Sequence, residues 1–181
     1  MDMPIRRKRI ARATLIATAF LFSGEIWTQA AEADFTAFKM RIRQRFPTVA
    51  QLSTTELAAW WNDPARAKPI LLDVRTEKEF AVSHLHGAMR VEPSANAGKL
   101  LARLPRDRPV VTYCSVGYRS SEFAEKLQRA GVISVYNLEG SIFQWANEGR
   151  PIEANGRPTE KVHPYNRKFG QMLDEKKRAS E

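Results

Sequence analysis

The chain has 181 residues, of which 43% are hydrophobic, 27% charged and 9% aromatic. This length suits one domain with extensions, and this composition excludes collagen-like, low-complexity and wholly disordered chains. Lysine and arginine outnumber aspartate and glutamate by 29 to 20, so the net charge of +9 favours anionic partners in general without identifying one.

Residues 1–33 have the three parts of a secretory signal peptide. A basic stretch at 5–9 precedes an apolar core at 13–22, and small residues follow it up to position 33. The sequence therefore predicts export, most simply to a bacterial periplasm, with the mature chain beginning near Asp34. A membrane-spanning helix needs about 20 apolar residues, and the apolar core here is shorter, since the charged Glu25 follows soon after it. An uncleaved membrane anchor is therefore the second interpretation. A cleaved mitochondrial presequence is the third.

Two helices are predicted ahead of the first strand. A short lead-in helix is expected within residues 34–48, where apolar residues recur at helical spacing until Pro47 ends the run. The second helix follows Ser53, which with Glu56 fits a capping box in which each side chain satisfies a backbone N–H of the other. This helix is expected to end near residues 62–64.

Strands and helices alternate through the next part of the chain. The apolar runs at 70–74 and 110–113 are typical of strands buried on both faces, and 132–138 is a weaker third run. Helices are predicted over 76–82, around 100–104, over 120–130 and over 141–148. The alternation predicts an α/β fold, with a central, mainly parallel sheet flanked by helices on both faces.

The last part of the chain is more polar. Residues 152–181 contain prolines and the charge-rich stretch 174–178, which predicts a basic, polar C-terminal tail. The main domain is therefore expected to span residues 49–151, and the tail is expected to pack over it and then fray.

Cys114 is the main candidate for chemistry. As the single cysteine it cannot form an intramolecular disulfide, and no paired Cys/His spacing predicts a metal site. It follows directly on the predicted strand 110–113, so it lies at the carboxyl edge of the sheet, where open α/β folds bind ligands.

The segment after Cys114 is short enough to curl around the sulfur. Its residues are Ser115, Val116, Gly117, Tyr118, Arg119 and Ser120, the last of which is expected to open a helix. A positive φ at Gly117 would let successive N–H groups form an anion nest, and the helix N-terminus and Arg119 would add positive charge. These features favour a reactive thiolate over a buried structural cysteine.

Residues 49–151 resemble the single-domain form of the rhodanese (thiosulfate sulfurtransferase) superfamily. The resemblance rests on four motifs in the expected order: LDVR at 72–75, SHLHGA at 83–88, CSVGYRS at 114–120, and LEGS at 138–141 with Trp145. The sequence departs from the family pattern at His86, where the family usually has proline, and at Ser141, where it usually has a second glycine.

The resemblance implies a sulfurtransferase that forms a persulfide on Cys114. The amides from Ser115 to Ser120 would cradle the persulfide, and Arg119 would bind the anionic donor or help to fix the loop. Asp73 and Arg75 would form a buried polar pair that supports the site. The implied partners are a small anionic sulfur donor such as thiosulfate and a thiol, cyanide or protein acceptor, with no metal and no organic cofactor.

Two other functions remain open on the sequence. A phosphatase or arsenate reductase shares the design of a cysteine in a nest, but typically has one residue more between Cys and Arg than the four present here. A non-catalytic binding module of the same fold is disfavoured by the intact Cys114 and Arg119. The basic residues are not interleaved with aromatic ones, so no nucleic-acid partner is expected, and membrane contact is expected only if the N-terminal segment stays uncleaved.

Overall fold

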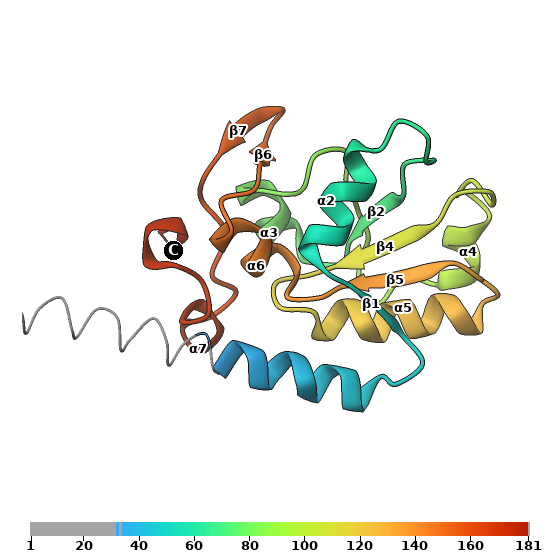
Figure 1. Cartoon of the computed structure of the whole chain (residues 1–181), viewed down its shortest axis with the longest axis horizontal. Helices are drawn as coiled ribbons and strands as arrows, with labels where there is room; N and C mark the ends of the chain where they lie inside the picture. Colours follow the sequence, from blue (N-terminus) through green and yellow to red (C-terminus); the bar gives the residue numbers. More distant parts are fainter. Residues whose placement is uncertain (1–31, 33, 181) are drawn as a thin grey trace, which may run out of the picture.

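The centre of the fold is a sheet of five parallel strands in the order β1-β5-β4-β2-β3 (Figure 1). The computed structural model describes residue 32 and residues 34–180, so the predicted signal over 1–33 lies outside the described residues except for Glu32. The strands are β1 (Ala50–Leu52), β2 (Ile70–Asp73), β3 (Met89–Arg90), β4 (Val110–Tyr113) and β5 (Val135–Leu138). The predicted parallel sheet is confirmed. The edge strands β1 and β3 were not predicted, because they are too short to show a pattern.

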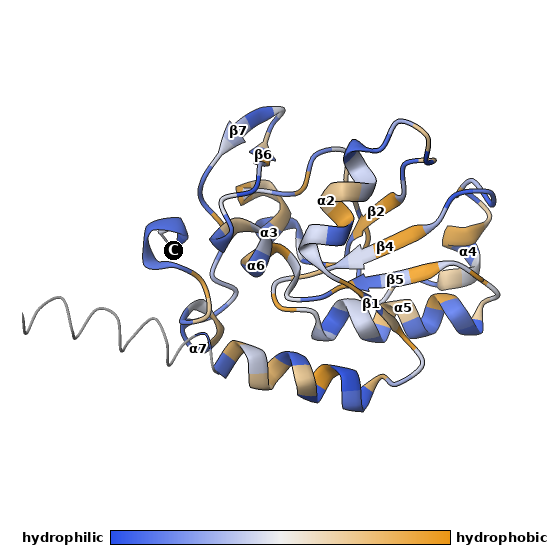
Figure 2. Ribbon diagram, in the orientation of Figure 1, coloured by the Kyte–Doolittle hydropathy of each residue, from blue (hydrophilic) through white to orange (hydrophobic). Residues whose placement is uncertain are grey.

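Helices cover both faces of the sheet. Alternate residues of the central strands point to opposite faces, so Leu71 and Val111 join one core cluster while Leu72 and Val110 join the other. The first cluster lies under α2 (Thr54–Asn62) and α6 (Ser141–Asn147), and the second under α4 (Ala97–Leu101) and α5 (Tyr118–Arg129). The lead-in helix at 34–45 contributes Phe35 to the first cluster and Ile42 to the second. Figure 2 shows the hydrophobic residues gathered on β2 and β4, between these layers. The two-sided burial explains why these strands read as continuous apolar runs.

Local signals in the sequence set the helix starts. The predicted capping box of Ser53 and Glu56 opens α2, and a second one, formed by Thr76 and Glu79, opens α3 (Glu77–Val82). Helix α5 begins at Tyr118, two residues earlier than predicted, because the left-handed Gly117 turns the chain directly into the helix.

Residues 152–180 fold against the domain. They form the antiparallel pair β6 (Ile152–Ala154) and β7 (Arg157–Thr159), the short helix α7 (Arg167–Gly170) and the 3-10 turn Glu175–Lys177. Ile152, Val162 and Leu173 are buried in the core, and the end predicted to fray is held by an isolated bridge between Val162 and Arg178. Composition alone missed these anchors, because three apolar side chains do not change the average polarity of the segment.

No helix within residues 34–180 is long and apolar enough to cross a membrane.

Candidate functional site

The sulfur of Cys114 lies at the carboxyl end of β4, next to the N-terminus of α5. The backbone N–H of Gly117 donates a hydrogen bond to Sγ over 3.1 Å, and the Ser120 hydroxyl lies 3.4 Å from the same atom. The residue is 1% exposed, so bulk water screens these contacts little. Two hydrogen-bond donors and a helix N-terminus therefore surround this sulfur.

Helix α6 holds the start of the loop in place. The N–H groups of Ile142 and Phe143 donate to the carbonyl oxygens of Cys114 (3.2 Å) and Ser115 (3.1 Å). These are amides of the first turn of α6, which have no acceptor within their own helix. With its carbonyls directed towards α6, the loop is fixed in one orientation relative to the sulfur.

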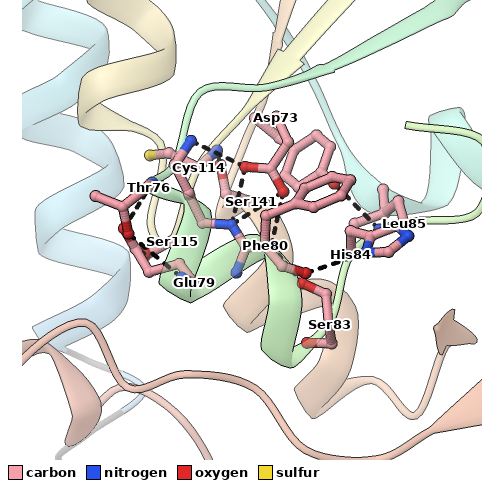
Figure 3. A network of polar contacts seen from close by, with 12 residues as sticks. Asp73, Thr76, Glu79, Phe80, Ser83, His84, Leu85, Cys114, Ser115 and Ser141 are labelled. Atoms are coloured by element: carbon pink, nitrogen blue, oxygen red, sulfur yellow. Dashed lines mark hydrogen bonds and ion pairs between the residues drawn. The ribbon is translucent and has the colours of Figure 1, made fainter. Parts of the chain in front are cut away.

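Ser141 explains one departure from the family pattern. Its hydroxyl accepts the N–H of Cys114 (3.1 Å) and donates to the carbonyl of Leu138 (3.0 Å), as part of the network in Figure 3. Its φ of +51° lies in the left-handed region, which serine adopts rarely. The two hydrogen bonds compensate for this conformation, so serine replaces the usual glycine and ties β5 and α6 to Cys114. The sequence marked the position as unusual without indicating its role.

The backbone at residue 117 favours a glycine, and a larger residue there would make close contacts. Its φ is +108°, and a Cβ atom there would lie 3.3 Å from Asn137 Nδ2 and 3.4 Å from Ile42 Cδ1. The predicted positive φ is therefore present. The loop amides from Ser115 to Ser120 are expected to form a nest around the sulfur. Of these, the amide of Gly117 donates a hydrogen bond to Cys114 Sγ.

Arg119 is engaged by a carboxylate that the sequence analysis did not single out. Its guanidinium forms a two-pronged ion pair with Glu79 (Nη1–Oε2 3.0 Å and Nη2–Oε1 2.7 Å), and Nη2 also donates to the Ser115 hydroxyl (3.0 Å). Figure 3 shows Glu79 beside Ser115 and Thr76. Of the two roles that the resemblance implied for Arg119, these contacts match fixing the loop. The capping-box pattern of Thr76 and Glu79 could have identified Glu79 as a helix cap. It could not have shown that Glu79 is the counter-ion of Arg119, which lies 40 positions later.

The Glu79 carboxylate stays ionised in this environment. Burial alone would raise its pKa, but the hydrogen bonds and charge of Arg119, with help from the Thr76 amide and the Ser115 hydroxyl, lower the pKa to about 2. Burial would likewise lower the pKa of Arg119, but Glu79 and the nearby Cys114 raise it. The pair therefore stays charged on both sides at neutral pH.

Asp73 and Arg75 form the expected buried pair. Both side chains are fully buried, and Arg75 Nη2 lies 2.6 Å from Asp73 Oδ2 and 2.5 Å from the Ser83 carbonyl oxygen. The pair ties β2 to the segment after α3 (Figure 3). With no exposure, neither side chain can contact a substrate.

A cavity of about 300 Å³ opens above Cys114. Loop residues form its floor, and aromatic side chains from the lead-in helix and from the segment around α7 form its walls. The lining residues are Phe38, Cys114, Ser115, Val116, Tyr118, Arg119, Tyr165 and Phe169. Phe38 lies within the predicted lead-in helix, whereas no local sequence pattern relates Tyr165 and Phe169 to Cys114.

His84 and His86 do not line this cavity, and both contact other side chains. The His84 ring stacks on Phe80 with ring centroids 4.0 Å apart, and His86 Nδ1 contacts Glu153 over 2.7 Å. Within the described part of the chain, no group of three or more His, Cys, Asp or Glu side chains is arranged to hold a metal ion.

The chain is similar to rhodanese-like proteins, some of which are named sulfurtransferases. The family model of the rhodanese-like domain matches residues 53–148. A protein named "Sulfurtransferase" from Allochromatium vinosum is 36% identical over 85 residues, which are 47% of this chain and 78% of that protein. The "Probable adenylyltransferase/sulfurtransferase MoeZ" of Mycobacterium tuberculosis is 39% identical over 92 residues, which are 50% of this chain but 23% of that protein.

Solved structures share the fold. A rhodanese-like domain protein from Staphylococcus aureus aligns with a TM-score of 0.51 at 23% identity, over 60% of this chain and all of the other. A thiosulfate sulfurtransferase from Pseudomonas aeruginosa aligns with a TM-score of 0.57 at 21% identity, over 75% of this chain and 26% of the other.

Proposed function

Because the chain belongs to the rhodanese-like domain family, we propose that it is a sulfurtransferase that transfers a sulfane sulfur through a persulfide on Cys114. The observation that supports the proposal best is the donation of the Gly117 N–H to Cys114 Sγ at the N-terminus of α5. A sulfur held this way is stabilised as an anion, which is the form that attacks another sulfur.

The proposed reaction has two displacements. In the first, the Cys114 thiolate attacks the outer sulfur of thiosulfate, an S–S bond forms, and the bond to the sulfonate sulfur breaks so that sulfite leaves with the electron pair. In the second, an acceptor thiolate or cyanide attacks the outer sulfur of the persulfide, and Cys114 leaves as a thiolate. No net redox partner is needed in either step.

The loop contacts suit both steps. The Gly117 amide and the Ser120 hydroxyl that now contact Sγ would also stabilise the persulfide anion, while Glu79 and Arg119 keep Ser115 in place. Asp73 and Arg75 would act as support, at a distance from substrate.

The test is to incubate the purified protein with thiosulfate, remove small molecules and measure the intact mass. We expect the mass to rise by one sulfur atom and to return on addition of cyanide or a thiol. Cys114→Ser should abolish the change, and Ser53→Ala, in the distant cap of α2, should leave it intact. An unchanged wild-type mass, or a Cys114→Ser variant that still transfers sulfur at the wild-type rate, would rule out this mechanism.

The same preparation is expected to hydrolyse aryl phosphates negligibly. A phosphoryl group must seat three oxygens inside the nest, whereas a sulfane sulfur only extends the cysteine by one atom. Four residues, Ser115 to Tyr118, lie between Cys114 and Arg119, so the ring of donors is small. An additional glycine after Gly117 should widen it and weaken persulfide formation. Hydrolysis of an aryl phosphate through Cys114 faster than turnover of thiosulfate would favour phosphatase chemistry instead.

We further propose that the chain is exported and begins near Asp34 in its mature form. The proposal rests on the sequence of residues 1–33 alone. Amino-terminal sequencing of protein recovered from its producing host tests it, and an intact Met1 in a membrane fraction would favour an anchor.

A further inference from the structure

The walls of the cavity come from segments that lie outside the family domain. The family match covers residues 53–148, whereas Phe38 precedes that range and Tyr165 and Phe169 follow it. Figure 1 shows the lead-in helix and α7 meeting beside the loop that precedes α5. The cysteine loop thus lies within the matched family domain, whereas three aromatic residues of the cavity wall lie outside it.

These aromatic side chains are held in a fixed arrangement. Phe169 packs edge to face against both Phe38 and Tyr165, with ring centroids 5.4 and 5.7 Å apart. The Arg119 guanidinium lies over the Tyr165 ring, 4.5 Å from its centroid. Tyr165 keeps a φ of +64°, a conformation unfavourable for a bulky residue, so its ring contacts compensate for a strained backbone. Strain of this kind concentrates at ligand sites.

The positive charge of Arg119 in the cavity is already paired. Among the described side chains of the lining, Arg119 is the only cationic one, and Glu79 pairs with it through two hydrogen bonds. Thiosulfate is a small dianion that loses much hydration on entering such a space, and the Arg119–Glu79 pair offers it little net positive charge in return. An aryl or alkyl group, by contrast, gains contact with Phe38, Tyr165 and Phe169.

We propose that this cavity selects organic sulfur compounds, in which an aryl or alkyl group lies against the aromatic walls while the reacting sulfur faces Cys114. The inference rests on the proposed sulfurtransferase function and adds its substrate class. A volume of about 300 Å³ is at the lower end for small-molecule sites, so a single ring with a short sulfur-bearing group suits it.

The chemistry is the same for such compounds. With an aryl thiosulfonate as donor, the Cys114 thiolate attacks the terminal sulfur, an S–S bond forms, and an arylsulfinate leaves with the electrons of the broken bond. With an aryl or alkyl thiolate as acceptor, the thiolate bonds to the outer persulfide sulfur and Cys114 leaves as a thiolate. The acceptor departs as an organic persulfide.

The test compares benzenethiosulfonate with thiosulfate, in which an anionic oxygen stands in place of the phenyl group, using one acceptor and the full chain. We expect wild-type kcat/KM to favour benzenethiosulfonate at least tenfold, since one apolar group in a hydrophobic pocket changes specificity by about 10- to 200-fold. Tyr165→Asn and Phe169→Ala should lower the value for benzenethiosulfonate about tenfold and that for thiosulfate less than about twofold. Asparagine is chosen because it tolerates the left-handed backbone of Tyr165.

Met40→Ala is the matched control. Met40 lies on the same helix as Phe38 but is 56% exposed and outside the lining, so both donors should react with this variant as with wild type. A variant that merely misfolds would lose activity towards both donors equally, so the ratio of the two kcat/KM values separates selection from instability.

The outcomes distinguish the two levels of the proposal. If thiosulfate loads Cys114 but wild type shows no preference for the aryl donor, or if the wall variants leave the ratio unchanged, the inference about substrate class is wrong and the sulfurtransferase proposal stands. If neither donor adds sulfur to Cys114, the proposed function fails and the substrate class fails with it.

Discussion

Replacing Glu79 with glutamine tests the electrostatics beneath the loop. The substitution keeps the size of the side chain and removes the charge that faces Arg119 at 2.7 Å. The pKa of Glu79 falls from 4.5 to about 2 on folding. One pKa unit corresponds to about 1.4 kcal/mol, so the ionised carboxylate contributes about 3 kcal/mol to the free energy of unfolding at neutral pH.

The sign of the pH dependence follows from the direction of this pKa. A carboxyl group with a lowered pKa stabilises the fold above its unfolded value of 4.5, and the contribution is lost as the pH falls towards 2. At neutral pH, the free energy of unfolding of Glu79→Gln should therefore be about 3 kcal/mol lower than that of the wild type. This difference in the free energy of unfolding should shrink steadily below pH 4.5. The Arg119 side chain is 21% exposed, so its charge can contact water in the variant. The loss of unfolding free energy should therefore stay below the largest values seen when one partner of a fully buried ion pair is removed.

Urea unfolding of both proteins between neutral pH and about pH 3 measures the effect. Glu122→Gln removes the same charge from an exposed position of α5 and should change the free energy of unfolding by less than about 0.5 kcal/mol. The reasoning is refuted if Glu79→Gln matches wild type at neutral pH, or if its deficit is as large near pH 3 as at pH 7.

Three further substitutions test the support of the site. Asp73→Asn leaves the charge of Arg75 buried with a neutral partner and should lower the free energy of unfolding by about 3 to 5 kcal/mol in urea; a loss below about 1 kcal/mol would contradict this. Gly117→Ala places a Cβ at a φ of +108° and displaces the amide from Sγ, so persulfide formation followed by mass should slow markedly, and a wild-type rate would show that this hydrogen bond is dispensable. Leu173→Ala should cost about 2 to 5 kcal/mol in thermal or urea unfolding, because this side chain is 1% exposed; an unaltered transition would mean that the C-terminal segment is not part of the core.

Local patterns were enough to predict the layers and the position of the cysteine. The continuous apolar runs of β2 and β4, the capping box at Ser53 and the left-handed Gly117 are each written within a few residues, since burial, helix capping and backbone freedom depend on near neighbours. From these, the sequence alone determined a parallel α/β fold with Cys114 at the carboxyl edge of the sheet.

The surroundings of Cys114 depended on contacts between distant parts of the chain. Glu79 meets Arg119 across 40 positions, and Ser141 meets Cys114 across 27. Phe38 and Phe169 come from opposite ends of the described chain to form one wall. None of these contacts can be recognised from the sequence around either residue. The residues that flank a side chain in the sequence are the same whether it contacts a distant residue or solvent. Only the tertiary structure could therefore decide that Arg119 is held by a carboxylate and that the sulfur opens into an aromatic cavity.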